Sequence, residues 1–218
     1  MKFKGKYIQI SCDGGAATGK STGAKMIAKK FGLQFLSSGL LYRFASYLIL
    51  KNNPKNKITF LKKKIKKLNY KKLTKVNLHT PVISEHSAII AKNNEIRKIL
   101  REFQIKFSKN YKNCCIEGRD ISTKILPNSD VKFFFVCNLK IAARRRFKQL
   151  KKISPKIKLK NVEKALRLRN KLDSNRKHSP LLKHRNSVVI DTGKLNKQAM
   201  LKKMTVYVEK AFLKKYGY

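Results

Sequence analysis

Residues 14–21 read Gly-Gly-Ala-Ala-Thr-Gly-Lys-Ser, which is the spacing of a phosphate-binding loop. In such a loop, glycines let the backbone turn so that several N–H groups point into one concavity and bind phosphate oxygens. The lysine reaches the outer phosphates of a nucleotide, and the serine hydroxyl ligates magnesium. The pattern therefore predicts that Lys20 binds phosphate and that Ser21 binds Mg²⁺. The alternative is an ordinary glycine-rich turn between a strand and a helix.

The residues on both sides of this loop favour phosphate binding. The segment 7–11 is short and rich in strand-forming residues, so it predicts a strand that runs into the loop. After the loop, apolar side chains recur at helical spacing from Lys20 to Phe31. A helix that begins at Lys20 would add its positive N-terminal end to the same concavity.

Three more clusters of polar residues carry arginine, at 38–43, 117–120 and 169–176. The planar fork of arginine suits phosphate oxygens, which it holds with two hydrogen bonds. In the second and third clusters a carboxylate lies close to the arginine. The alternative is that these arginines lie on solvated helix faces, as is usual in a basic chain.

Strands and helices are predicted to alternate along the chain. Besides 7–11, strands are expected at 34–38, 113–117, 131–137 and 187–191, and helices at 20–31, 39–50, 94–109, 139–150, 161–173 and 196–215. Residues 80–84 could form another strand, at the end of a lysine-rich stretch that interrupts the alternation of strands and helices. The pattern predicts an α/β fold with a five-stranded parallel sheet flanked by helices. Because ligands of such folds bind beyond the carboxyl ends of the strands, the arginine clusters are candidates for a site there.

The composition of the 218 residues narrows the class of protein. Hydrophobic residues make up 42%, enough for a substantial core, and no apolar run approaches the ~20 residues of a membrane helix. The first strand follows so soon after Met1 that no room is left for a signal peptide, so we expect a cytoplasmic protein without a membrane partner. The four cysteines form no C-x-x-C pair, which predicts free thiols rather than a zinc site or disulfides.

The formal net charge of +43 has two interpretations. Lysines could neutralise the phosphates of a nucleic acid. Lysine also occurs in nearly every segment of the chain, which indicates a general compositional bias. A basic surface would in either case attract anionic nucleotides.

With these clusters the chain resembles the bacterial cytidylate kinases, which belong to the nucleoside monophosphate kinase group. The matching stretches follow the order of the family and span nearly the whole chain: 13–22, 38–43, 118–121, 143–150, 169–176 and 190–192. The Gly118-Arg119-Asp120 segment together with the late arginine–aspartate cluster is much more specific than the loop alone.

The resemblance implies a P-loop kinase core with two additions. The core would comprise 1–51, 94–146 and 168–218, with a monophosphate-binding insertion at about 52–93 and a lid at about 147–167. ATP would be the phosphoryl donor, held with Mg²⁺ by Gly14, Gly15, Ala16, Ala17, Thr18, Gly19, Lys20, Ser21 and Thr22. Glu117 would either orient waters of the magnesium ion or be a plain carboxylate at a strand end.

The resemblance also implies an acceptor site and catalytic residues. The monophosphate pocket would be lined by Ser38, Tyr42 and Arg43, and the cytosine edge would be read by Arg97 and Asp120. The ribose would face Arg169 and Asp173. Lys20, Arg119 and Arg176 would be catalytic, since they would neutralise charge on the acceptor and transferred phosphates. The chain departs from the family at Ser37, Ala88, Asn170 and Leu172, which bears on base and sugar selection.

The activity implied is ATP-dependent phosphorylation of CMP and dCMP to their diphosphates by a monomer. Nucleic acid would bind only through nonspecific electrostatics. One alternative is another small P-loop kinase with a different acceptor. A second alternative, from a different class, is a basic nucleic-acid-binding ATPase.

Overall fold

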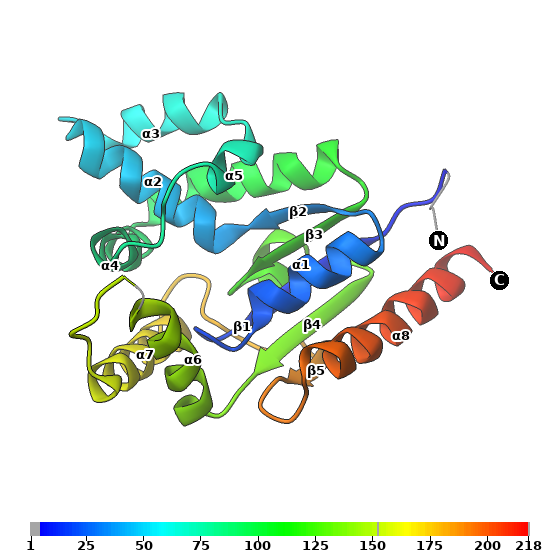
Figure 1. The fold of residues 1–218 in the computed structure, drawn as a ribbon. Coiled ribbons are helices and arrows are strands. Elements are labelled where there is room, and N and C mark those ends of the chain that lie inside the picture. Colours follow the sequence, from blue (N-terminus) through cyan, green and yellow to red (C-terminus); the bar gives the residue numbers. More distant parts are fainter. Residues whose placement is uncertain (1–4, 152, 218) are drawn as a thin grey trace. The chain divides into compact units, whose positions relative to one another are not determined.

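The computed structural model describes residues 5–151 and 153–217. The chain separates into two compact units (Figure 1). We call Met1–Phe35 with Tyr111–Tyr218 the core unit and Leu36–Asn110 the helical unit. Each unit is described by itself below.

A five-stranded sheet has the order β2-β3-β1-β4-β5. Its strands are β1 (Gln9–Gly14), β2 (Gln34–Ser37), β3 (Cys114–Gly118), β4 (Val131–Val136) and β5 (Val188–Asp191). The pairs β1–β3, β1–β4 and β4–β5 are parallel, which confirms the predicted parallel sheet. The first strand begins two residues later than predicted and continues to Gly14, so it carries the chain directly into the phosphate-binding loop.

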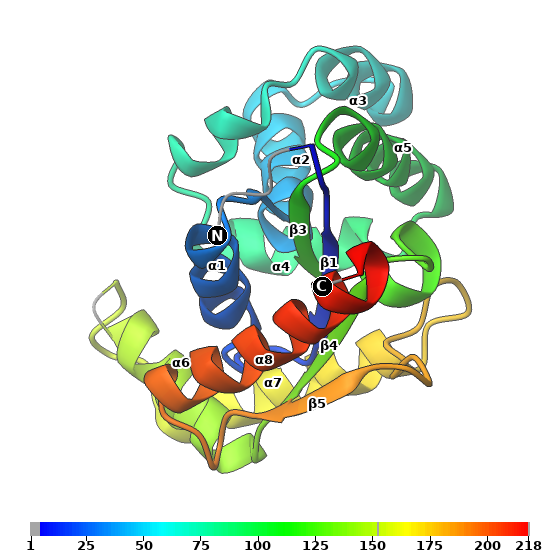
Figure 2. The ribbon, with the colours of Figure 1, turned by 90° about the vertical axis from the view of Figure 1, so that its right-hand side faces the viewer.

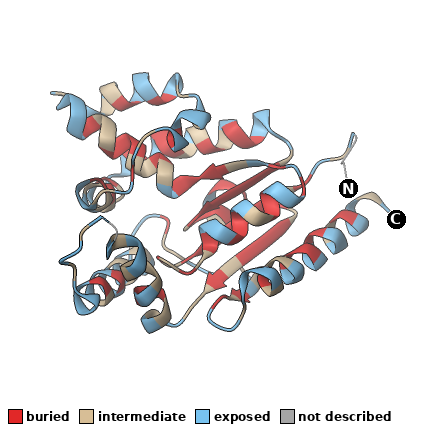
Figure 3. Cartoon of the chain, in the orientation of Figure 1, coloured by how far each residue is buried: buried red, intermediate tan, exposed pale blue. Residues whose placement is uncertain are grey.

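Helices α1 (Lys20–Lys30) and α8 (Lys197–Tyr216) cover one face of this sheet. Alternate strand residues such as Ile10, Cys12 and Phe133 share a buried cluster with side chains of both helices. Because successive side chains of a strand point to opposite faces, Ser11 and Asp13 point to the other face. Figure 3 shows that the central strands are mostly buried.

The remaining elements of the core unit follow the carboxyl ends of the strands. A short π-helical turn, η2 (Ile121–Ile125), comes soon after β3. Helices α6 (Leu139–Lys151) and α7 (Leu159–Ser174) pack against each other through a small cluster that includes Ala142, Val162 and Ala16 of the phosphate-binding loop. The predicted charged break between these helices holds Pro155, whereas its residue 152 lies outside the described residues.

The helical unit contains α2 (Ser38–Asn52), α3 (Lys57–Lys66), η1 (Tyr70–Thr74), α4 (Pro81–Ile90) and α5 (Asn94–Asn110) (Figures 1 and 2). The expectation of a strand at 80–84 is wrong, because this segment begins α4. The Thr80 hydroxyl accepts a hydrogen bond from Ile83 N at 3.3 Å, and Pro81 occupies the first helical turn. Proline is well tolerated there, since its missing N–H would have no partner in the helix. Among the residues that the structure describes, no helix has the length and apolar character needed to span a membrane.

Candidate functional site

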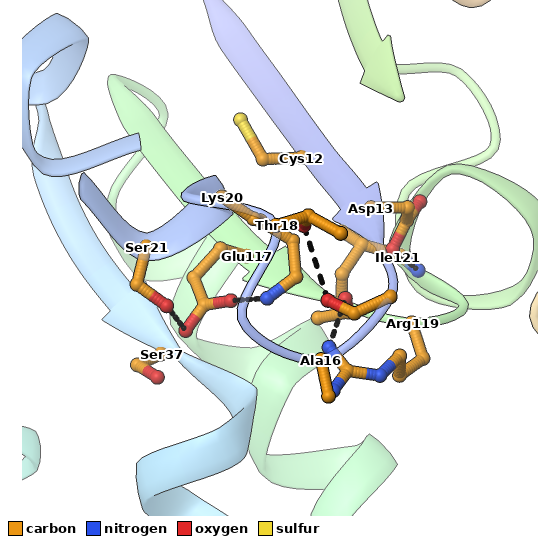
Figure 4. Close-up of polar contacts among 12 residues, drawn as sticks. Cys12, Asp13, Ala16, Thr18, Lys20, Ser21, Ser37, Glu117, Arg119 and Ile121 are labelled. Atoms are coloured by element: carbon orange, nitrogen blue, oxygen red, sulfur yellow. Dashed lines mark hydrogen bonds and ion pairs between the residues drawn. The ribbon is translucent and has the colours of Figure 1, made fainter. Parts of the chain in front are cut away.

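The phosphate-binding loop joins β1 to α1 (Figure 4). Its conformation depends on two glycines. Gly14 has a φ of +150°, and a Cβ there would collide with the backbone oxygen of Phe135 on β4. Gly19 has a φ of +78° and immediately precedes the first residue of α1. Between them Ala17 has a φ of 58°, which is uncommon for a residue with a side chain. The loop thus turns sharply at the positive end of α1, as an anion-binding loop requires.

Lys20 and Ser21, the last two residues of the loop, both contact Glu117 of β3 (Figure 4). Lys20 Nζ lies 2.5 Å from Glu117 Oε2, and the Ser21 hydroxyl donates to Oε1 at 3.1 Å. Both partners of the ion pair are buried, with 7% and 3% of their side-chain surface exposed. Burial lowers the pKa of Lys20, while the Glu117 carboxylate opposes that shift by stabilising the ammonium. The structure therefore joins three predicted residues in one polar group.

This group fits a magnesium ion that is carried in with a nucleotide. A hydroxyl and a carboxylate are hard oxygen donors of the kind that Mg²⁺ prefers, and Mg²⁺ usually takes only one or two protein ligands beside phosphates and waters. Within residues 5–151 and 153–217, no group of three or more His, Cys, Asp or Glu side chains could hold a metal. The donor set thus suits a shared site on a nucleotide, and it does not suit an all-protein metal cage.

Asp173 on α7 gathers three arginines from the predicted clusters. Arg119 Nε donates to Asp173 Oδ2 at 2.8 Å, and Arg176 Nη1 lies 3.6 Å from Oδ1. Arg169 Nε lies 4.0 Å from Oδ2. Burial alone would raise the pKa of Asp173, but the charges of the three arginines and the Arg119 hydrogen bond hold it below its usual value. One carboxylate faces three guanidinium groups, so the cluster keeps a positive charge that can bind anions.

Apart from Asp120, the other predicted acceptor residues lie in the helical unit. Ser38, Tyr42 and Arg43 occupy the first turns of α2, whose N-cap is the Ser37 hydroxyl, which accepts from Leu40 N at 3.2 Å. The guanidinium of Arg97 on α5 lies 5.7 Å from the centre of the Tyr42 ring. Arg43 Nη1 is 3.4 Å from His79 Nδ1. The helical unit therefore contains two arginines, an aromatic ring and a hydroxyl of the predicted acceptor site, of which Arg97 and Ser38 are buried.

Asp120 belongs to the core unit and is buried at the N-terminal end of η2, directly after Arg119. The predicted site residues are thus divided between the units: the loop, Glu117, Asp120 and the three arginines around Asp173 in the core unit, and Ser38, Tyr42, Arg43 and Arg97 in the helical unit.

Several contacts to the loop were not expected from the sequence. The Thr192 hydroxyl donates to Thr18 O at 2.7 Å and accepts from Arg145 Nη1 at 2.9 Å. Asn170 Oδ1 accepts from Ala16 N at 3.0 Å. Thr192 directly follows β5, so the rule that sites lie beyond strand ends could have singled it out. No local signal marks Asn170 as a partner of the loop.

Comparison with known proteins gives a consistent result. The family model described as cytidylate kinase matches residues 10–210. A cytidylate kinase of Clostridium tetani (strain Massachusetts / E88) is 32% identical over 222 residues, covering 96% of this chain and 97% of that protein. A cytidylate kinase of Bartonella tribocorum (strain CIP 105476 / IBS 506) is 35% identical over 199 residues, covering 89% and 91%.

Among solved structures, a shikimate kinase from Bacteroides thetaiotaomicron matches with a TM-score of 0.53 and 11% identity, covering 93% of this chain and 98% of that one. At this low identity the likeness concerns the fold alone, which is that of a small kinase. With a family match over nearly its whole length, the chain belongs to the cytidylate kinase family.

Proposed function

We propose that the protein transfers the terminal phosphoryl group of ATP to the phosphate of CMP or dCMP, giving the nucleoside diphosphate and ADP. A new bond forms between an oxygen of the acceptor phosphate and the γ-phosphorus, and the bond from that phosphorus to the β–γ bridging oxygen breaks. The observation that carries the proposal is that one unit holds both a phosphate-binding loop and three arginines around Asp173. Family membership supports CMP as the acceptor.

The residues of the core unit would act mainly by positioning and by stabilising charge, which dominate phosphoryl transfer. Lys20 would hold the outer phosphates of ATP on the loop, and Ser21 and Glu117 would hold the magnesium ion. Magnesium, when bound, would supply positive charge beside the phosphate oxygens. Arg119 and Arg176 would neutralise charge on the acceptor and transferred phosphates. No general base is needed, because the acceptor oxygen is already ionised.

The acceptor would be selected by the residues that the family resemblance assigns to it. Ser38, Tyr42 and Arg43 would bind the monophosphate, and Arg97 with Asp120 would read the cytosine edge. Cytosine offers an exocyclic amine donor beside acceptors, which suits a carboxylate paired with an arginine. Arg169 and Asp173 would face the ribose. The insertion at about 52–93 would contribute to this pocket.

The lid at about 147–167 would close over the phosphates and exclude water, which would otherwise accept the phosphoryl group. Within this segment, Val162 and Leu166 of α7 pack with Ala142 and Ala143 of α6. We further propose that the enzyme acts as a monomer in the cytoplasm, where its nucleotide substrates are found, and that nucleic acid binds it only nonspecifically.

A panel of acceptors tests the proposed function. ADP release would be measured with ATP, Mg²⁺ and each of CMP, dCMP, UMP, AMP and GMP, with the Lys20→Ala variant as a control for contaminating kinases. We expect the highest kcat/KM with CMP and dCMP, and no turnover when Mg²⁺ is chelated. Activity with AMP but none with CMP would instead indicate another small P-loop kinase. ATP hydrolysis that RNA or DNA stimulates and CMP does not affect would indicate a nucleic-acid-binding ATPase.

A further inference from the structure

Asp13 is a buried carboxylate that the proposed mechanism does not use. It lies on β1 immediately before Gly14, with no exposed surface, and its side chain points away from the face that α1 covers. Asp13 Oδ1 accepts from Ile121 N at 2.8 Å. Its Oδ2 accepts from Ser122 N at 2.7 Å and from the Ser122 hydroxyl at 2.6 Å. A buried carboxylate is costly unless it is bonded in this way.

The two backbone N–H groups belong to the first residues of η2. Such groups at the start of a helical turn have no partner within the turn and need an acceptor from elsewhere. Usually the N-cap residue supplies one, but the side chain of Asp120 at that position makes no capping hydrogen bond. Asp13, which lies on β1, therefore accepts the hydrogen bonds that the side chain of an N-cap residue normally accepts.

This arrangement connects two functional segments. Arg119 and Asp120 immediately precede the capped turn, and Gly118 is the parallel partner of Asp13 in the β1–β3 ladder. The residue after Asp13 opens the phosphate-binding loop. A single carboxylate thus joins the start of the loop to the segment that carries an arginine and an aspartate of the proposed acceptor site.

The charge of Asp13 bears on the pKa of Asp13 itself and on that of Lys20. Burial raises the pKa of Asp13, and the hydrogen bonds from Ser122 and Ile121 oppose that shift because they stabilise the carboxylate. The negative charge of Asp13 also favours the ammonium form of Lys20, but it is the smallest influence on the pKa of Lys20, and the Glu117 carboxylate has the larger effect. An apolar side chain would avoid the cost of burial but could not cap the turn.

We propose that Asp13 is a positioning residue for phosphoryl transfer, which holds Arg119 and Asp120 in register with the phosphate-binding loop without contacting either nucleotide. The inference rests on the proposed function, since it assigns Arg119 and Asp120 to the acceptor. It predicts that loss of the cap affects the acceptor more than the donor. The loop has its own supports, from Thr192 to Thr18 and from Asn170 to Ala16.

The test uses two variants that differ in how much of the cap they remove. Asp13→Asn keeps the shape but replaces one acceptor oxygen by an NH₂ group, so one backbone N–H of η2 loses its partner. Ser122→Ala removes only the hydroxyl bond and leaves both backbone bonds. For Asp13→Asn we expect kcat to fall at least about tenfold and KM for CMP to rise at least about fivefold, because small misplacements of catalytic groups are costly. The Kd for ATP should change less than about twofold, and Ser122→Ala should show a smaller effect in the same direction.

Asp130→Asn is the matched control. Asp130 also accepts a backbone N–H of β1, from Gln9 at 2.7 Å, but at the opposite end of the strand. This variant should lower the thermal midpoint of unfolding while leaving KM for CMP unchanged. Amide hydrogen exchange gives a readout that does not depend on activity: exchange in residues 119–125 should become faster in Asp13→Asn and stay unchanged in Asp130→Asn.

Several results would overturn the proposal. One is a folded Asp13→Asn enzyme with normal kcat and KM for CMP. Another is a loss of equal size for CMP and ATP, or the same kinetic change in Asp130→Asn, either of which would indicate a purely structural role. If the unmodified enzyme used a different monophosphate and not CMP, the proposed function would fail, while KM for that acceptor and the exchange rates would still decide the role of Asp13.

Discussion

At the scale of single residues, Glu117 has two interpretations from the sequence: a carboxylate that orients waters of the magnesium ion, or a plain carboxylate at a strand end. A carboxylate at a strand end can be incidental, yet here it contacts both Lys20 and Ser21. Burial lowers the pKa of Lys20, and the buried pair with Glu117 opposes that shift because it favours the ammonium form. The side chain that would bind phosphate is thus held at the loop by a carboxylate from the neighbouring strand.

Lys20→Ala should lower kcat at least about 100-fold, the scale of losing one charge contact in the transition state. Steady-state ADP release at saturating CMP would measure the effect. The control is Lys30→Ala, which removes an exposed lysine from the other end of the same helix and should leave the rate unchanged. A folded Lys20→Ala enzyme that keeps its full rate would refute the assigned role.

At the scale of elements, α1 is held close to the sheet because Gly23 faces β4. A Cβ on Gly23 would lie 2.7 Å and 2.9 Å from ring atoms of Phe135 and 3.2 Å from the sulfur of Met200. Both neighbours are buried and cannot easily move aside. The absence of a side chain here therefore sets how closely the helix that starts in the loop approaches the sheet.

Gly23→Ala should destabilise the protein despite the better helix propensity of alanine. Overpacking costs about 1–3 kcal/mol and the propensity gain returns about 1 kcal/mol, so we expect a net loss of up to about 2 kcal/mol in the free energy of unfolding. Gly39→Ala is the matched control, because a Cβ at that helical position would only meet Ser37 Oγ at 3.7 Å. Urea denaturation should show it as stable as the unmodified protein or more so. Equal stability of both variants would contradict the packing argument.

At the scale of the whole molecule, charge is the dominant property. The chain has 54 lysines and arginines against 11 acidic residues. In the helical unit, every lysine between Lys51 and Lys75 is exposed, and no acidic residue lies among them. Such a surface attracts polyphosphates over distances that exceed direct contact.

The affinity for ATP should consequently depend on salt. Exposed charges are screened over about 10 Å at 0.1 M salt, so we expect the Kd for ATP to rise at least about threefold between about 50 and 300 mM NaCl. Titration calorimetry with ATP, and with uncharged adenosine as control, would separate this effect from a general loss of binding. A constant Kd for ATP over that range would show that the surface lysines do not contribute.

Much of the fold could be predicted because buried strands and amphipathic helices leave periodic patterns in the chain. The apolar run at β4 and the helical spacing in α5 are examples. The error at 80–84 arose because a short apolar run fits a strand or the first turn of a helix equally well. The hydrogen bond that Ile83 N donates to the Thr80 hydroxyl caps the helix and favours it over a strand. The predicted strand at 7–11 ends too early, since β1 continues to Gly14. The hydrogen bonds from Ile121 and Ser122 let the carboxylate of Asp13 lie buried in the strand.

The amino-acid sequence by itself determined the phosphate-binding loop, the alternation of strands and helices, and the order of the arginine clusters. These depend on residue types and on spacings within a few turns or strands, which local sterics and hydrophobic periodicity translate directly into structure. Only the tertiary structure decided three contacts. Arg119 donates to Asp173, Thr192 contacts the loop, and Asp13 caps a turn after β3. Each of these contacts joins residues far apart in the chain, and no local preference specifies them, because they form only when the packed sheet brings the ends of its parallel strands together.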